Sequence, residues 1–174
     1  MDFWDPALID ALTARRPVVI FDNAGVGKSS GEIPPTYQGW ADNVITVVQV
    51  LGIKQIDLLD FSMGGCCVQM VALTAPWLVR KLIFAGTRES QGPTMDTNSM
   101  HSGPLAILSS SNTPEDIEKS IAESFCYWTD EGRAAAKASW ERIHERAHDR
   151  SPFLDLEGAK QQNVTLKDLY AESE

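Results

Sequence analysis

The stretch "LLDFSMGG", residues 58–65, joins three different patterns. Its apolar start belongs to a run of β-formers that is typical of a buried strand. Ser62 follows, and Gly64 and Gly65 open the segment "MGGCCVQMVALTA", where apolar side chains recur at helical spacing. We therefore expect a strand, a tight turn at Ser62 and then a helix.

A serine at such a turn has the geometry of a nucleophile elbow, in which the hydroxyl stands above the edge of the sheet. The Met63 amide, with the helix start behind it, would point toward an oxyanion developing on a substrate. Small residues are needed two positions either side of the serine: Gly64 fits this requirement and Asp60 departs from it. Serine is also a favoured helix N-cap, which is the alternative interpretation. Ser62 and Met63 are our candidate catalytic residues.

The sequence around this turn alternates helix and strand patterns. Helical spacing occurs in "ALIDALTA" (7–14) and "TYQGWADNVITVVQVLG" (36–52), and β-rich apolar runs occur at Val18–Phe21, 55–60 and 79–85. One face of the second helix carries Trp40, Val44, Val47, Val48 and Leu51. Strands without polar alternation, joined by amphipathic helices, indicate an α/β fold with a mostly parallel sheet flanked by helices.

The second half of the sequence is different. A polar stretch at 87–104 is followed by Thr113 and Asp116, whose spacing is that of a capping box and predicts a helix start. A longer helix is expected over residues 130–148, with a seam of Ala136, Trp140, Ile143 and Ala147. This half shows no strand pattern and no internal repeat. We expect a partial core over residues 1–87 and a helical, lid-like region over 88–174.

Composition limits the function classes. The net charge of −9 supplies no positive field for a nucleic-acid partner. No apolar run reaches the roughly 18 residues of a membrane helix, and the first residues, "MDFWDPALID", lack the features of a signal peptide. Three cysteines, two of them adjacent in a helical pattern, indicate reduced buried thiols and a cytoplasmic protein.

The turn "AGVGKSS", residues 24–30, offers a different function. Its Gly27-Lys28-Ser29 end matches a phosphate-binding loop, but Asp22 occupies the position of the first glycine and would repel phosphate. Such a loop must also lead directly into a helix that binds the anion, whereas Pro34 and Pro35 follow here. Nucleotide binding is therefore a third hypothesis behind those built on Ser62.

The pattern "HERAH", from His144 to His148, matches the zinc motif H-E-x-x-H. The surrounding Glu and Arg residues make a solvated helix face an equally direct interpretation. A zinc site also needs a third ligand, and neither His101 nor Glu157 has a spacing that recommends it. We predict no metal and no cofactor.

The order of motifs from Phe3 to Gly86 resembles that of the α/β-hydrolase family. Members read D-x-x-G-x-G-x-S after one strand, then a helix, the serine elbow, and P-x-x-V-x-x-L-I-x-x-G. The matching positions here are Asp22, Gly25, Gly27, Ser29, Ser62, Gly64, Gly65, Pro76, Val79, Leu82, Ile83 and Gly86. The resemblance implies a partial α/β-hydrolase fold and a serine ester or acyl hydrolase that acts on a small molecule through Ser62.

The family scheme also has parts that this sequence does not match. The acid and the histidine follow the lid in the family, whereas His101, His144 and His148 all fall within lid-like sequence. The family's His-Gly oxyanion loop would precede residue 1. We therefore expect a truncated member with weak or no turnover on its own.

The family strand order, 1-2-4-3-5-6-7-8, carries a second expectation. The family's fourth, fifth and sixth strands correspond here to Val18–Phe21, 55–60 and 79–85. In the family the third strand lies between the fourth and the fifth, and we expect it to be missing from this chain. An open sheet edge could then hold a protein partner or a second copy. The alternative function is a non-catalytic accessory or binding protein that uses the lid-like helices as its contact surface.

Overall fold

The computed structural model describes residues 2–87, 113–151, 158 and 161–162. Its elements are α1 (Pro6–Thr13), α2 (Tyr37–Val50), β1 (Ile56–Phe61), α3 (Met63–Thr74), the 3-10 helix η1 (Pro76–Leu78), β2 (Val79–Ala85), α5 (Pro114–Phe125) and α6 (Asp130–His144). They fall into two compact units. The first unit takes Met1–Phe21 and Asp96–Pro152, and the second takes Asp22–Met95 and Phe153–Glu174. The sequence-based division into residues 1–87 and 88–174 follows family architecture and stays a prediction.

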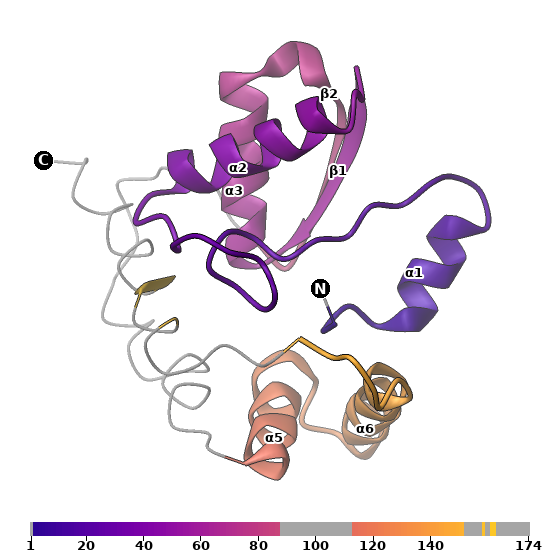
Figure 1. Ribbon diagram of the computed structural model, residues 1–174. Helices are drawn as coiled ribbons and strands as arrows, with labels where there is room; N and C mark the ends of the chain where they lie inside the picture. The colour runs from indigo at the N-terminus through magenta and orange to yellow at the C-terminus, as the bar shows by residue number, and fades with distance from the viewer. Residues whose placement is uncertain (1, 88–112, 152–157, 159–160, 163–174) are drawn as a thin grey trace, which may run out of the picture. The chain divides into compact units, whose positions relative to one another are not determined.

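The second unit contains a parallel strand pair flanked by helices, as predicted. β1 and β2 run parallel, with Ile56 opposite Val79 and Phe61 opposite Ala85. α3 packs against both strands, and α2 packs against α3 (Figure 1). Parallel neighbours need a crossover, and here the crossover is α3 with η1. α3 begins directly after Ser62 and packs against both strands, so it holds the Ser62 turn at the end of the strand pair.

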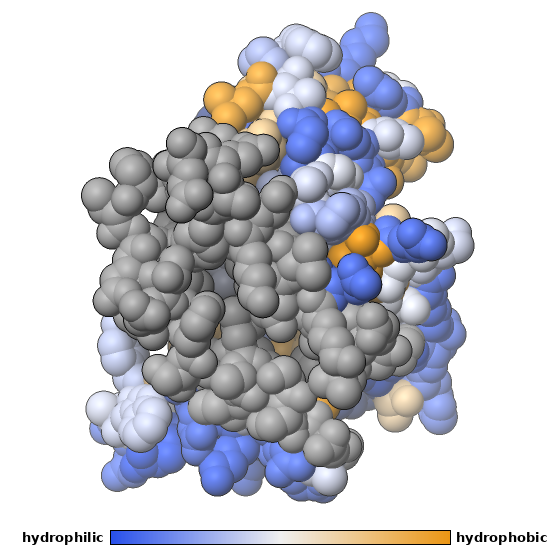
Figure 2. Space-filling model, turned by 90° about the vertical axis from the view of Figure 1, so that its left-hand side faces the viewer, coloured by the Kyte–Doolittle hydropathy of each residue, from blue (hydrophilic) through white to orange (hydrophobic). Residues whose placement is uncertain are grey.

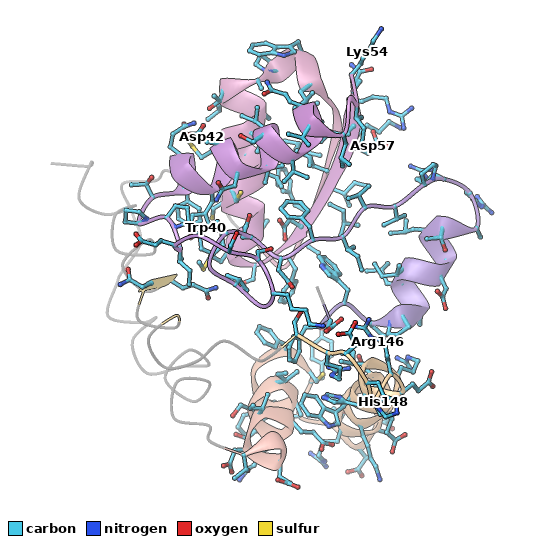
Figure 3. All side chains as sticks on the ribbon, viewed as in Figure 1. Trp40, Asp42, Lys54, Asp57, Arg146 and His148 are labelled. Atoms are coloured by element: carbon cyan, nitrogen blue, oxygen red, sulfur yellow. The ribbon has the colours of Figure 1, made fainter. Side chains whose placement is uncertain are left out.

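The core of this unit lies between α2 and α3. Its buried residues are Tyr37, Trp40, Ala41, Val44, Val48, Cys66, Cys67, Val71, Ala75 and Leu78. Trp40, labelled in Figure 3, also donates its indole N–H to the Pro34 carbonyl at 2.7 Å. Thr36 caps the start of α2 through the Gly39 amide. The loop before α2 is thus fixed to the helix by both apolar burial and hydrogen bonds.

The predicted apolar face of α2 is wrong at its last position. Trp40, Val44 and Val48 are buried and Val47 is half-buried, whereas Leu51 is 52% exposed. α2 ends at Val50, and Gly52 follows with a φ of +69°. The buried core residues of α2 end at Val48, so Leu51 lies beyond the core although its own backbone is still helical, at φ −72° and ψ −6°.

The predicted strand at Val18–Phe21 is also wrong. Residues 17–23 carry no secondary structure, and the described sheet contains β1 and β2 alone. A strand is defined by the partner that satisfies its backbone groups, and propensity does not supply that partner. Val19, Ile20 and Phe21 are 55%, 39% and 37% exposed, so this segment also lacks the burial that the sequence pattern predicts.

Large apolar side chains reach the surface of the second unit. Val50 and Leu73, near the ends of α2 and α3, are 81% and 70% exposed, and Phe84 on β2 is 50% exposed. Figure 2 shows apolar residues at the surface among polar ones. Among the described residues, no helix has both the length and the apolar composition of a membrane span.

The first unit contains the helices α1, α5 and α6. The capping box at the start of α5 is confirmed: the Thr113 hydroxyl accepts from the Asp116 amide, and the Asp116 carboxylate accepts from the Thr113 amide. α6 ends at His144, four residues earlier than predicted. Ala147 therefore lies outside the helix and is exposed, so the predicted seam stops at Ile143.

Two aspartates that precede α1 connect the start of the chain to α6 and to the residues just after it. Asp5 caps α1 by accepting from the Ala7 amide at 2.9 Å, and it also accepts from the Ser139 hydroxyl and the Arg142 guanidinium. The Arg142 hydrogen bond holds the pKa of Asp5 well below its ordinary value. Asp2 pairs with Arg146, which is labelled in Figure 3 and lies two residues beyond the end of α6.

Asp5→Ala is expected to lower the free energy of unfolding by about 1 to 2 kcal/mol, because it removes a helix cap and the partner of Ser139. The Arg142 pair is partly exposed and adds little. Urea denaturation at pH 7 measures the loss, with Asp10→Ala on the exposed side of α1 as the control. An equal loss of stability in both variants would contradict this assignment.

The pKa of Asp5 in the folded protein lies below 3.8. The stabilisation by the Asp5 carboxylate is therefore complete above that pH and is lost as the pH falls below it.

Candidate active site at the Ser62 turn

Ser62 lies between the end of β1 and the start of α3, as the sequence predicts (Figure 1). Its backbone has φ +53° and ψ −121°. These angles belong to the first central position of a type II′ turn, which normally takes glycine. A serine in this conformation costs about 1 to 3 kcal/mol, which the surrounding structure must offset. The chain therefore reverses sharply at this one residue.

The interpretation of Ser62 as an ordinary helix cap does not fit this geometry. Thr36, Thr113 and Thr129 begin other helices with extended backbones, and each side chain accepts a hydrogen bond from an amide of the first turn. Ser62 has neither feature. Ser62 is half-buried, and within the part of the chain that the structure describes its hydroxyl is in no hydrogen bond.

Three hydrogen bonds hold the backbone of Ser62. Its amide donates to the Ala85 carbonyl at 2.9 Å. Its carbonyl accepts from the Gly65 amide at 3.0 Å and from the Thr87 hydroxyl at 2.6 Å. The turn is thus tied to the first turn of α3 and to the end of β2.

Gly64 and Gly65 are required by close neighbours. A Cβ on Gly64 would lie 2.1 Å from an Asp60 carboxylate oxygen, and one on Gly65 would lie 2.3 Å from the Thr87 hydroxyl oxygen. Non-bonded atoms do not approach this closely. Gly64, two positions after Ser62, therefore makes room for the Asp60 side chain. Asp60 is the residue, two positions before Ser62, that departs from the elbow pattern.

Asp60 lies beneath the turn on the α3 side of β1. Burial raises its pKa, although the Phe61 amide donates to the carboxylate at 2.8 Å and opposes this shift. Burial, with the Asp60 charge nearby, also raises the pKa of Cys67 to about 12. The Cys67 thiol therefore stays protonated at neutral pH and is not a competing nucleophile.

Met63 is the first residue of α3. The first amides of a helix have no acceptor within the helix, and the helix dipole adds positive potential there. Negative charge that develops beside Ser62 would therefore meet a favourable field. The start of α3 would thus supply the electrostatic stabilisation of the predicted site.

The turn at residues 22–30 is held by its own backbone. Gly25 and Gly27 have φ of +73° and +61°, and the Ser29 hydroxyl donates to the Asp22 carbonyl at 2.7 Å. The next helix begins only at Tyr37. The helix start that a phosphate-binding loop needs directly after Ser29 is thus absent from this described segment, which weighs against nucleotide binding.

The described histidines are found in the first unit, whereas Ser62 belongs to the second. The His144 ring makes a 2.8 Å contact with the Trp140 carbonyl through Nδ1. His148, labelled in Figure 3, lies beyond the end of α6, so the two histidines do not share a helix as a zinc motif requires. His101 and Glu157 lie outside the described residues. The described part of the chain holds no group of three or more residues suited to a metal ion.

Comparison with known families gives a match to the alpha/beta hydrolase fold over residues 1–159. The chain belongs to the α/β-hydrolase family. The resemblance from residue 3 to residue 86 is therefore confirmed, and the matched region extends well past it.

Curated relatives of this chain include proteins named "Putative carbamate hydrolase RutD". The protein from Caulobacter vibrioides (strain NA1000 / CB15N) is 36% identical over 83 residues, which are 47% of this chain and 30% of the relative. The protein from Serratia proteamaculans (strain 568) is 32% identical over 97 residues, 55% of this chain and 34% of the relative. The matched region thus spans about a third of the length of these relatives.

Solved structures give the same fold. An alpha/beta hydrolase fold protein from Chitinophaga pinensis superposes with a TM-score of 0.81 at 27% identity, over 97% of this chain and 58% of that one. A marine microorganism esterase superposes with a TM-score of 0.60 at 18% identity, over 92% and 62% of the two chains. At this low identity the second comparison supports the fold alone.

The sequence did not single out Thr87, although the structure places it in direct contact with the turn. It lies just beyond β2, two residues after Ala85, which accepts the Ser62 amide. The available signal is topological: parallel neighbouring strands bring the residues after both carboxyl ends to one edge of the sheet.

Proposed function

We propose that this α/β hydrolase acts on small acyl compounds of the ester type, with Ser62 as the nucleophile. The observation that carries the proposal is the Ser62 turn itself. A serine is held at φ +53° at the start of a helix, and among the described residues its hydroxyl is in no hydrogen bond. A positive φ in a residue other than glycine is backbone strain that the surrounding structure must maintain. Such strain concentrates at functional sites.

The proposed chemistry follows acyl transfer. The Ser62 oxygen attacks the carbonyl carbon of the substrate, and the carbonyl oxygen becomes negatively charged. The Met63 amide stabilises this oxyanion, the alcohol leaves, and water then hydrolyses the acylated serine. A base must take the proton of the Ser62 hydroxyl and return it to the leaving alcohol, and a histidine oriented by an acid does this in the family. The described residues assign neither partner to Ser62, and weak turnover stays our expectation for this chain.

The substrate class is supported by the family and by the names of the relatives. Proteins that share up to 36% identity with this chain are named for carbamate hydrolysis. Carbamates and esters both present a carbonyl carbon bonded to a heteroatom, so one nucleophile can serve both. Within this class we propose a small ester-type substrate.

A fluorophosphonate probe tests the proposal, because it transfers its phosphonyl group only to an activated serine oxygen and releases fluoride. We expect slow labelling that reaches one probe per chain, found by peptide mass spectrometry on the fragment that carries Ser62; rapid labelling would instead overturn the expectation of weak turnover. Heat-denatured protein is the control and should take up none. The proposal fails if the native chain takes up no probe, or if the probe is found on another serine.

A further inference from the structure

We propose that Thr87 is a positioning residue for this turn: its hydroxyl fixes the Ser62–Met63 peptide and thereby aims the Met63 amide. The inference rests on the proposed function, because that amide is the proposed oxyanion donor. It assigns a role to Thr87, which lies outside the serine turn, just after the end of the neighbouring strand β2.

The first step is the geometry of one peptide unit. The Ser62 carbonyl and the Met63 amide belong to the same peptide, which is trans and planar. In such a unit the C=O and the N–H point in opposite directions. Any group that fixes the direction of the Ser62 carbonyl therefore also fixes the direction of the Met63 N–H.

Thr87 is such a group. Its hydroxyl donates to the Ser62 carbonyl at 2.6 Å, shorter than the 3.0 Å bond that the same carbonyl accepts from the Gly65 amide. The Gly65 bond lies within the turn that continues into α3 and moves with it. Thr87 instead lies beyond β2, so it ties the carbonyl to the sheet.

The fit around Thr87 supports a fixed position. A Cβ on Gly65 would lie between 2.3 and 2.5 Å from three Thr87 side-chain atoms, so the side chain occupies the space that Gly65 leaves. The Ser62 amide donates to Ala85, two residues before Thr87. Both backbone polar groups of Ser62 are therefore held from the end of β2.

Thr87→Val tests the hydroxyl, because valine keeps the shape of threonine and loses the donor. Thr87→Ser keeps the donor and loses the methyl group. Thr46→Val is the matched control, since Thr46 also donates to a backbone carbonyl, that of Asp42 in α2, away from the turn. Thermal unfolding followed by circular dichroism confirms that each variant is folded.

Two readouts are needed. The first is the amide NMR signal of Met63 and the hydrogen exchange of the Ser62 amide, which report the peptide without any reaction. The second is the rate of fluorophosphonate labelling, which we expect to fall about fivefold in Thr87→Val, the change typical of one lost neutral hydrogen bond. Thr87→Ser and Thr46→Val should match the unchanged protein in both.

The outcomes separate the two proposals. If the unchanged protein takes up no probe but Thr87→Val alone shifts the Met63 signal, the proposed function fails and the positioning role stands. If Thr87→Val leaves the Met63 signal and the Ser62 exchange unchanged, the positioning role is overturned. It is also overturned if Thr87→Ser perturbs the turn as strongly as Thr87→Val, because the hydroxyl would then not be the group that matters.

Discussion

Ser62→Ala is expected to reduce fluorophosphonate labelling to the level of denatured protein while the chain stays folded. Labelling requires the Ser62 oxygen, and the neighbouring Cys67 thiol cannot replace it because burial and the Asp60 charge raise its pKa to about 12. Ser29→Ala is the matched control, since Ser29 also lies in a tight turn but its hydroxyl donates to Asp22. Labelling that survives in Ser62→Ala would contradict the assignment of the nucleophile.

Ser62→Gly separates the role of the Ser62 oxygen in labelling from the backbone strain at this position. It should lose labelling as completely as the alanine variant, yet it should raise the free energy of unfolding. Glycine adopts φ +53° without steric cost, so we expect a gain of about 1 kcal/mol after the entropy of the freer unfolded chain is subtracted. Urea denaturation measures the gain against Ser62→Ala. A glycine variant less stable than the alanine variant would show that the turn is not strained.

Gly64→Ala is expected to destabilise the second unit by about 3 kcal/mol, at the upper end of the usual cost of overpacking a core. Its new Cβ would lie between 2.1 and 2.6 Å from three atoms of the Asp60 carboxyl group. That group lies beneath the turn, where burial already raises its pKa, so it cannot move aside into water without disturbing β1. Urea denaturation again provides the measurement.

The control for this prediction combines Gly64→Ala with a substitution of Asp60. Asp60→Gly removes the carboxylate that the new methyl group meets, so Gly64→Ala should cost much less in that background. A double-mutant cycle over the four proteins is expected to show coupling greater than about 1 kcal/mol. Additive effects would contradict the clash as the cause.

The sequence predicts the elements around Ser62 because their signals are local. Apolar periodicity, Gly64, Gly65 and the residues that end each helix act over a few positions, so β1, α3 and β2 follow from the pattern. The capping box at Thr113 is local in the same way. The order of these local motifs was also enough to identify the family.

The features that the sequence could not supply depend on distant residues. Val18–Phe21 has the composition of a strand, but pairing decides whether a strand forms. Thr87 becomes part of the site only because β1 and β2 are parallel neighbours. Asp5 caps α1, and nothing near it in the sequence indicates Arg142 as a partner.

The pairing of Asp5 with Arg142 imposes an order of events during synthesis. The two residues are 137 positions apart, and ribosomes add about 5 to 20 residues per second, so Asp5 waits about 7 to 27 seconds for its partner. An eight-residue helix such as α1 is marginal in water without such support. We therefore expect α1 of the nascent chain to be sensitive to proteases until Arg142 has been translated, and to stay so on a ribosome that stalls before it.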